Sequence, residues 1–308
     1  MIHKAVMCST CVDLLVDNPA GCYVDGTLGG GGHTAEILSR LSDQGRVIGL
    51  DRDEAAIERV RSRFTAESRL TMVHENYSAL DRVLDNQGIA QVDGVLLDLG
   101  VSSFQLDEAD RGFSFQQEAP LDMRMDRTEK VDAATWLEDS SEEAISLALF
   151  HLGEERMARK IARAIKAEQK RKPIKTTIEL AQLVERTKGG RRGARIHPAT
   201  KTFQAIRMSI NAELEHLETA LRIMISRIKA GGRCVILTFH SLEDRMVKHF
   251  FAKHICREVA LEQGGVRIEG EQPYINWISK KPLQASAAEI AENPRARSAK
   301  LRAVSVGG

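Results

Sequence analysis

A carboxylate followed by a run of glycines is the first stretch of this sequence whose residue types could do chemistry. Residues 24–34 read VDGTLGGGGHT, with one acid, Asp25, ahead of glycines at positions 26 and 29–32. Glycines at the turn from a strand into a helix let a ligand reach bare backbone N–H groups at the positive end of that helix. The stretch therefore predicts a turn that binds a phosphate or a nucleotide-containing cofactor.

Three kinds of cofactor turn compete for this stretch. A phosphate-binding P-loop would end in Gly-Lys-Ser/Thr, whereas this turn ends in Gly32-His33-Thr34. A dinucleotide turn needs G-x-G-x-x-G, and Thr34 stands where the third glycine belongs. An S-adenosylmethionine turn has an acid before the glycines and a second acid closing the next strand, where a carboxylate can accept both ribose hydroxyls. Asp25 and Asp51 stand in that order, which favours S-adenosylmethionine.

Other polar residues are expected beside the same turn. Ligands of open α/β sheets bind outside the carboxyl ends of the strands, and Asp98 ends the apolar run VDGVLLD. Packing does not explain Asp98, because an unpaired buried carboxylate is costly. Tyr77 could lie over adenine or be a half-buried core tyrosine, and His33 could contact the cofactor or only cap the turn. Asp53 fits the N-cap of the following helix.

The elements that position these residues follow an alternating pattern. Strands are predicted at 21–26, 45–51, 69–74 and 92–100, with helices at 34–41, 53–64 and 77–88 between them. Strands that alternate with helices indicate a parallel sheet with right-handed crossovers.

The alternation stops near residue 107 and resumes about a hundred residues later. Mainly helical patterns fill the gap, and a long helix over 205–228 then ends at Gly231 and Gly232, as left-handed caps do. Strands follow at 233–239, YINWIS and KLRAVSV. We therefore predict an α/β fold whose open sheet is interrupted after its fourth strand. Residues 1–106 and 205–308 form the core, and 107–204 form an inserted, mostly helical domain.

Charge is segregated within the insertion, although the 308-residue chain has a net charge of only +1. Residues 107–143 hold twelve acids and four bases, residues 156–175 nine bases and one acid, and residues 186–212 seven bases and no acid. A solvated helix face explains the first basic stretch. The second is a Gly/Arg loop, and guanidinium groups suit phosphate oxygens. The candidate phosphate contacts are Arg191, Arg192, Arg195 and Lys201, with Arg295 and Arg297 as a second group.

The sequence also argues against several classes of protein. No signal peptide is evident, and no apolar run approaches the roughly 20 residues of a membrane helix. Five cysteines, an odd number with scattered spacing, fit a reducing cytoplasm. Cys8 and Cys11 form a C-x-x-C without the second pair that a zinc site needs, so we expect no metal. The oligomeric state, monomer or homodimer, is left open.

Long, unusual strings of the chain resemble one protein family. VDGTLGGGGHT, LDLGVSS, RGFSF, PLDMRMD, FHSLEDR and NPRARSAKLR are similar to the ribosomal RNA small subunit methyltransferase H family, over essentially the whole chain. Two departures are Ala5, where the family has proline, and a shorter stretch between Cys256 and Tyr274. The resemblance implies a class I S-adenosylmethionine methyltransferase, Rossmann-like, with an inserted helical domain.

The family methylates the exocyclic N4 of one cytidine of 16S rRNA near the ribosomal P site. By resemblance, the substrate is a nearly assembled small ribosomal subunit. The cofactor contacts then fall on Gly31, Gly32, His33, Asp51, Tyr77, Asp98 and Gln105.

For the catalytic groups, the sequence offers several candidates and no single motif. Many amine methylases carry Asp/Asn/Ser-Pro-Pro-aromatic after the fourth strand, whereas residues 98–101 read DLGV. Asp98, Ser102 and Ser103 are candidates for accepting a hydrogen bond from the reacting amine. Ser241 with Asp244 fits a capping box, which leaves His240 to face the target base.

Two other classes of function remain open on the sequence. A nicotinamide oxidoreductase would share the sheet and Asp51, but the third glycine is missing. A non-catalytic RNA-binding protein would keep the basic insertion without needing a glycine turn and strand-end acids.

Overall fold

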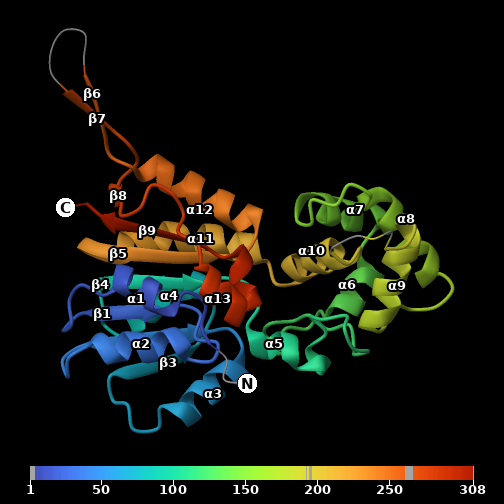
Figure 1. The fold of residues 1–308 in the computed structure, drawn as a ribbon, viewed down its shortest axis with the longest axis horizontal. Coiled ribbons are helices and arrows are strands. Elements are labelled where there is room, and N and C mark those ends of the chain that lie inside the picture. Colours follow the sequence, from blue (N-terminus) through green and yellow to red (C-terminus); the bar gives the residue numbers. More distant parts are fainter. Residues whose placement is uncertain (1–3, 192, 194–195, 261–265, 308) are drawn as a thin grey trace. The chain divides into compact units, whose positions relative to one another are not determined.

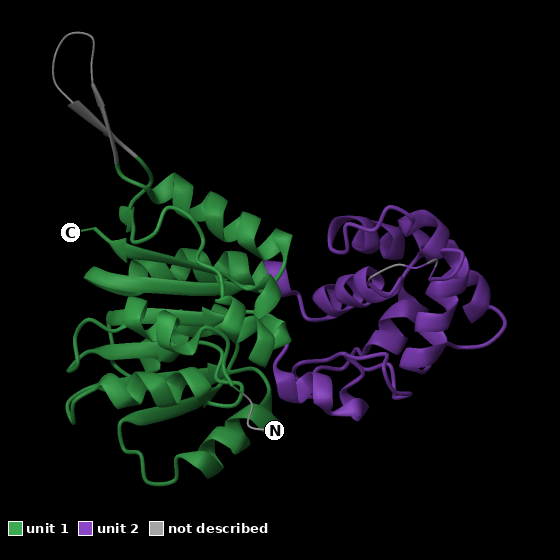
Figure 2. Ribbon diagram, in the orientation of Figure 1, with its two compact units in different colours: residues 1–100, 215–308 green, residues 101–214 purple. Residues whose placement is uncertain are grey.

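The computed structural model describes residues 4–191, 193, 196–260 and 266–307. The chain divides into two compact units (Figure 2). Unit 1 consists of residues 1–100 and 215–308, and unit 2 of residues 101–214. The helical insertion predicted at 107–204 falls inside unit 2.

Unit 1 is built on a seven-stranded sheet of order β3-β2-β1-β4-β5-β9-β8 (Figure 1). The first five of these strands are parallel, β9 is antiparallel to β5, and β8 is antiparallel to β9. All four strands predicted in the first hundred residues are present. The strands are β1 (Cys22–Asp25), β2 (Arg46–Asp51), β3 (Leu70–His74), β4 (Val92–Asp98), β5 (Ile228–Thr238), β8 (Ile275–Trp277) and β9 (Lys300–Val306).

Helices cover both faces of this sheet, so the strands are apolar on both sides. One face packs against α4 (Leu80–Asn86), α11 (Glu213–Arg227) and α12 (Ser241–His254). The other packs against α1 (Cys8–Leu15), α2 (Gly32–Arg40) and α3 (Glu54–Arg63). Unit 1 also contains three short elements, η1 (Tyr77–Ala79), α13 (Ala287–Glu292) and η3 (Pro294–Ser298). A three-layer α/β sheet of this kind is the fold class that the sequence predicted.

One predicted helix is wrong in its extent. The expected single helix over 205–228 is two helices, α10 (Thr200–Ile210) and α11, separated at Ala212, whose φ is +45°. The Asn211 side chain causes the break, because it accepts a hydrogen bond from the Met125 N–H and donates to the Met123 carbonyl. Gly231 is not a helix cap, since β5 already begins at Ile228 and pairs there with β4.

Unit 2 is helical around its own apolar core. Its helices α6 (Ala133–Asp139), α7 (Glu142–His151), α8 (Ala158–Gln169), α9 (Thr177–Thr187) and α10 bury one stripe each against the others. Short elements α5 (Ser103–Asp107) and η2 (Ala109–Arg111) precede them.

A separate two-stranded ribbon is formed by β6 (Arg257–Ala260) and β7 (Val266–Glu269). Among the described residues, no helix combines the length and apolar character needed to cross a lipid bilayer.

Candidate active site

Three carboxylates stand at the carboxyl ends of three neighbouring strands of unit 1. Asp51 ends β2, Asp25 ends β1 and Asp98 ends β4, and β1 lies between the other two strands. Burial raises the pKa of all three side chains, to about 6, about 7 and about 8 respectively. Raised carboxyl pKa values clustered at one sheet edge are typical of a functional site.

The last bend of the glycine turn between β1 and α2 strongly favours glycine. Gly31 has a φ of +72°, and a Cβ added there would lie 3.0 Å from the Phe64 ring. Arg63 of α3 donates a hydrogen bond of 2.9 Å to the Gly30 carbonyl. This hydrogen bond from α3 therefore fixes the backbone of the turn.

Asp51 fixes the start of this turn through both of its oxygens. Oδ2 accepts a hydrogen bond from the Gly29 N–H at 2.8 Å, and Oδ1 accepts one from the Asp53 N–H at 2.9 Å. Each carboxylate oxygen has a second lone pair that can accept from a ligand hydroxyl. Asp53 itself accepts from the Ala55 N–H and caps α3, as the sequence predicted.

Asp25 is enclosed beneath the turn. Its side chain is fully buried, accepts a hydrogen bond of 2.6 Å from the Thr34 hydroxyl, and accepts another from the Thr27 N–H. Burial raises the pKa of Asp25, although both hydrogen bonds oppose that rise. The residue thus ties the end of β1 to the first turn of α2.

His33 is buried, and its neighbours fix its tautomer. Nε2 lies 3.1 Å from the Val6 carbonyl, which can only accept, so the ring proton resides on Nε2. Burial lowers the pKa of His33 to about 4, which keeps the ring neutral. Nδ1 then presents a lone pair to Asp98, whose Oδ2 is 3.6 Å away.

Asp98 carries a carboxylate oxygen without a partner. Its Oδ1 is buried and has no hydrogen-bond partner among the residues that the structure describes. Burial, with the nearby negative charges of Asp25 and Glu243, raises the pKa of Asp98 to about 8. A proton on Oδ2 would face the His33 lone pair and leave Oδ1 as a free acceptor. A buried oxygen of this kind is a candidate contact for a bound ligand.

The segment before α1 lies against the glycine turn, which sequence reasoning missed. Its backbone is anchored from α13, because the Glu289 carboxylate accepts the Met7 N–H at 2.6 Å. The Cys8 thiol donates to the Gly32 carbonyl at 3.6 Å. Burial raises the pKa of Cys8 to about 12 and that of Cys11 well above its usual value, so both stay protonated thiols. No local sequence signal announces these contacts, since they join residues up to 282 positions apart.

Tyr77 lies beside the carboxyl end of β1. A Cβ added at Gly26 would lie 3.2 Å from the Cβ of Tyr77, so the two backbones are close. Asn76 caps η1 by accepting a hydrogen bond from the Ser78 N–H, which fixes the start of that turn. The Tyr77 side chain is half-buried and packs against the core, which agrees with its predicted core role. The contact with adenine stays a prediction.

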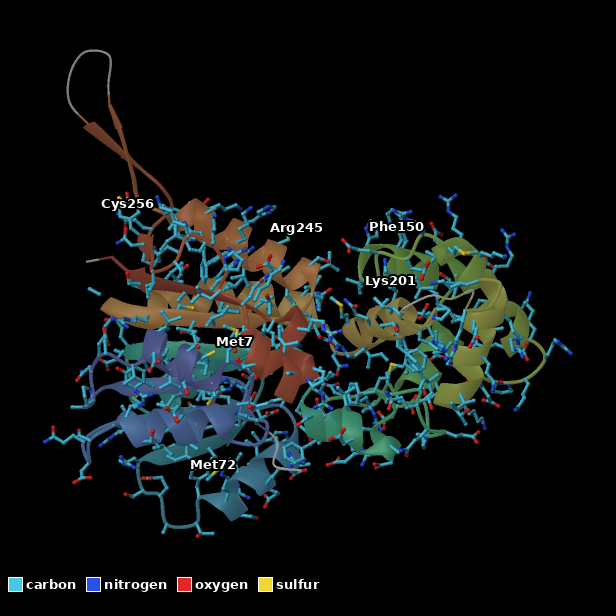
Figure 3. All side chains as sticks on the ribbon, viewed as in Figure 1. Met7, Met72, Phe150, Lys201, Arg245 and Cys256 are labelled. Atoms are coloured by element: carbon cyan, nitrogen blue, oxygen red, sulfur yellow. The ribbon has the colours of Figure 1, made fainter. Side chains whose placement is uncertain are left out.

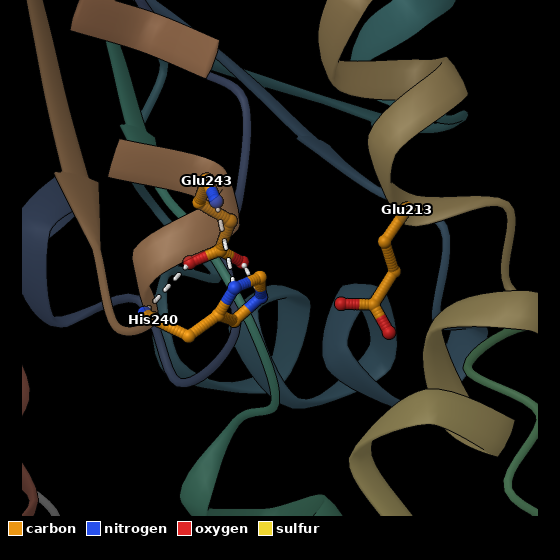
Figure 4. Close-up of side chains that lie close together, drawn as sticks. All are labelled: Glu213, His240 and Glu243. Atoms are coloured by element: carbon orange, nitrogen blue, oxygen red, sulfur yellow. Dashed lines mark hydrogen bonds and ion pairs between the residues drawn. The ribbon is translucent and has the colours of Figure 1, made fainter. Parts of the chain in front are cut away.

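The predicted capping box of α12 is displaced by one residue. His240 is the N-cap: its Nδ1 accepts the Glu243 N–H at 3.4 Å, while Glu243 accepts the His240 N–H (Figure 4). His240 Nε2 also lies 3.0 Å from Oε1 of Glu243. Asp244 is instead paired with buried Arg302 of β9 at 2.7 Å. His240 therefore has a structural role that the sequence reading did not give it.

The remaining catalytic and cofactor candidates belong to unit 2. Ser102 caps α5, accepting a hydrogen bond from the Gln105 N–H, while the Gln105 side chain accepts from the Ser102 N–H. Gln105 is buried, and Ser103 is the first residue of α5. Ser102 and Gln105 thus form a capping box that begins four residues along the chain from Asp98.

The predicted phosphate contacts differ in their surroundings. Arg191 is exposed but lies 3.5 Å from the Glu185 carboxylate, and Lys201 donates to the Glu154 carbonyl. Arg295 and Arg297 are exposed on η3. Arg192 and Arg195 lie outside the described residues.

The chain is similar to curated proteins along almost its whole length. The profile of the MraW methylase family matches residues 1–306. The ribosomal RNA small subunit methyltransferase H of Syntrophotalea carbinolica is 44 % identical over 304 residues, covering 98 % of this chain and 97 % of its own. Its namesake from Nitrosomonas eutropha is 45 % identical over 308 residues, covering 98 % and 96 %. A solved rRNA methylase from Streptococcus thermophilus covers 100 % of this chain and 99 % of its own, at 12 % identity and a TM-score of 0.43.

Proposed function

The chain belongs to the MraW methylase family, and we propose that it methylates 16S ribosomal RNA with S-adenosylmethionine, at the exocyclic N4 of one cytidine near the P site. The observation that carries the proposal is the set of strand-end carboxylates around the glycine turn, in a chain that matches methyltransferase relatives from end to end. The reaction belongs in the cytoplasm, where small ribosomal subunits are assembled.

The residues at the sheet edge fit S-adenosylmethionine. The ligand carries a sulfonium, an ammonium and a ribose diol. Carboxyl groups can accept hydrogen bonds from the ammonium and the diol, and they attract the positively charged sulfur. Asp51 retains lone pairs for the ribose hydroxyls. When bound, the cofactor supplies an electrophilic methyl group on a positively charged sulfur.

The protein's part in the reaction is positioning and hydrogen bonding. The N4 amine of cytosine is a weak nucleophile, since its lone pair is delocalised into the ring. Holding it in line with the methyl group supplies much of the rate. An acceptor oxygen that takes an amine N–H stabilises the charge that develops there. We assign this acceptor to Asp98 Oδ1, with Ser102 and Ser103 as the alternatives on α5.

We propose that the His240 side chain contacts the target base. Its Nδ1 accepts the Glu243 N–H and so caps α12, which makes its structural role separable from a contact with the base. His240→Asn keeps a good N-cap while removing the imidazole, and His240→Ala removes both. If the imidazole contacts the base, both variants lose turnover on 30S particles. If His240→Asn stays fully active, the residue only caps the helix.

RNA contacts are proposed at Arg191, Lys201, Arg295 and Arg297, together with Arg192 and Arg195. Reversing these charges is expected to weaken RNA association and to flatten its dependence on salt, while the affinity for S-adenosylmethionine stays unchanged. Unaltered RNA binding in the reversed variants would refute this assignment.

Two measurements test the proposed function against its rivals. Calorimetry should detect binding of S-adenosylmethionine and none of NADH, whereas binding of NADH alone would indicate an oxidoreductase. Wild-type protein should then transfer tritiated methyl groups to 30S particles that lack the modification. Binding of RNA without any transfer would favour a non-catalytic RNA-binding protein.

A further inference from the structure

Unpaired positive charge in the described part of unit 2 gathers on and next to α8. Ala158, Ile161, Ala162 and Ile165 of this helix are buried in the core. We define the basic stripe as five exposed bases, on α8 or within two residues of its ends, that lack an acidic partner among the described residues. They are Arg156, Arg159, Lys160, Lys170 and Arg171.

The basic stripe differs from other bases of the insertion in what surrounds it. Lys166 donates to the Leu137 and Glu138 carbonyls, and Lys172 pairs with Glu179. Within the described part of the chain, by contrast, no ion pair or side-chain hydrogen bond engages a member of the basic stripe. Five exposed cations within residues 156–171 without counter-charges raise the local positive potential and favour a polyanion.

The spacing of the basic stripe matches an extended ligand. From Arg159 to Lys170 the chain rises about 17 Å, so the stripe places cations near both ends of α8. A surface of that length spans several phosphates of a nucleic-acid strand. A single small anion would use only one end of it.

An exposed aromatic side chain lies on the neighbouring helix. Phe150, which Figure 3 labels on α7, is 58 % exposed and only six residues before Arg156 in the chain. α7 and α8 pack together through Ile145, Leu149 and the buried stripe of α8. Cations and an exposed ring on two helices that pack together can bind single-stranded RNA, because bases stack on the ring while the cations hold phosphates.

We propose that the basic stripe and Phe150 form an RNA-binding surface, in which the stripe holds successive phosphates and Phe150 stacks on an unpaired base. The inference rests on the proposed function, since it adds a docking surface for the same RNA substrate. It also assigns a role to the first basic stretch, for which the sequence favoured a solvated helix face.

Matched charge variants test the phosphate contacts. R159Q/K160Q removes two charges from the stripe, and R46Q/K253Q removes two exposed charges from unit 1. Binding of a short labelled single-stranded RNA is measured by fluorescence anisotropy from about 50 to 300 mM KCl. We expect the slope of log affinity against log salt to fall by about 1.4 for the stripe variant and to stay unchanged for the control. Equal slopes for the two variants would overturn the proposal.

Phe150→Ala and Phe150→Trp test the stacking contact. Loss of the ring should weaken RNA binding at least about fivefold without changing the salt slope, and tryptophan should retain the affinity. Unchanged binding in Phe150→Ala would remove the stacking role.

Methyl transfer by the wild-type protein distinguishes a failure of the RNA-binding surface from a failure of the proposed function. If wild-type protein methylates 30S particles and R159Q/K160Q binds RNA like the control, only the docking surface is wrong. If wild-type protein transfers no methyl group, the proposed function fails whatever the binding variants do. Preferential loss of binding to a protein of the particle, with RNA binding intact, would also contradict an RNA surface.

Discussion

The carboxyl group of Asp98 should make unit 1 less stable as the pH rises, and Asp98→Asn should remove that effect. Its pKa is raised from 3.8 to about 8 by burial and by the charges of Asp25 and Glu243. The folded state therefore holds one more proton than the unfolded state between about pH 4 and pH 8. Stability contributed by this proton is lost progressively as the pH rises through that window.

The size of this change in stability depends on the pKa shift of Asp98 and on how much of its side chain remains exposed to water. A shift of about four pKa units corresponds to at most about 5–6 kcal/mol. The Asp98 side chain keeps 24 % of its surface exposed, and water there screens part of the cost, so we expect about 3 kcal/mol. The amide introduced by Asp98→Asn would mimic the neutral acid and could donate to the bare Nδ1 of His33. The gain in free energy of unfolding should grow from about 1 kcal/mol near pH 5.5 to about 3 kcal/mol near pH 8.5.

Urea denaturation in a Trp136→Phe background measures this gain, because Trp277 of β8 then reports on unit 1 alone. Asp93, on the same strand, is the matched control. Burial alone would raise the pKa of Asp93, but hydrogen bonds from Lys229 and the Cys22 N–H lower it overall. Asp93→Asn should therefore destabilise the unit at both pH values. A gap between Asp98→Asn and wild type that does not widen with pH would refute the reasoning.

Three further perturbations test other contacts of the site. Glu289→Ala removes the acceptor of the Met7 N–H and should weaken S-adenosylmethionine binding in calorimetry, while Glu289→Gln should preserve it. Asp244→Ala leaves Arg302, which is 4 % exposed, without its partner and should cost about 3–5 kcal/mol of stability in urea denaturation. Gly31→Ala places a side chain at a φ of +72° and should cost about 1–2 kcal/mol while weakening cofactor binding, whereas an unchanged affinity would mean that the turn does not hold the cofactor.

The sequence was most informative where function depends on local pattern. The order of Asp25, the glycines, Asp51 and Asp98 located three adjacent strand ends, because alternating strands and helices fix which ends share an edge. The Asp53 cap was also readable, since a cap depends on residues two or three positions apart.

The sequence was least informative where distant contacts decide the outcome. The break at Asn211 arises from hydrogen bonds to residues more than eighty positions away. The tautomer of His33 depends on Val6, which no spacing rule connects to it. The cap of α12 was predicted at Ser241 and Asp244, but His240 and Glu243 form it, because Asp244 pairs with the distant Arg302.

The position of the transferred methyl group tests the central claim most directly. Wild-type protein is incubated with tritiated S-adenosylmethionine and unmodified 30S particles, and the 16S rRNA is digested to nucleosides. We predict that the label elutes as N4-methylcytidine and that Asp98→Ala reduces it strongly. Label on a base carbon or on ribose would contradict the account.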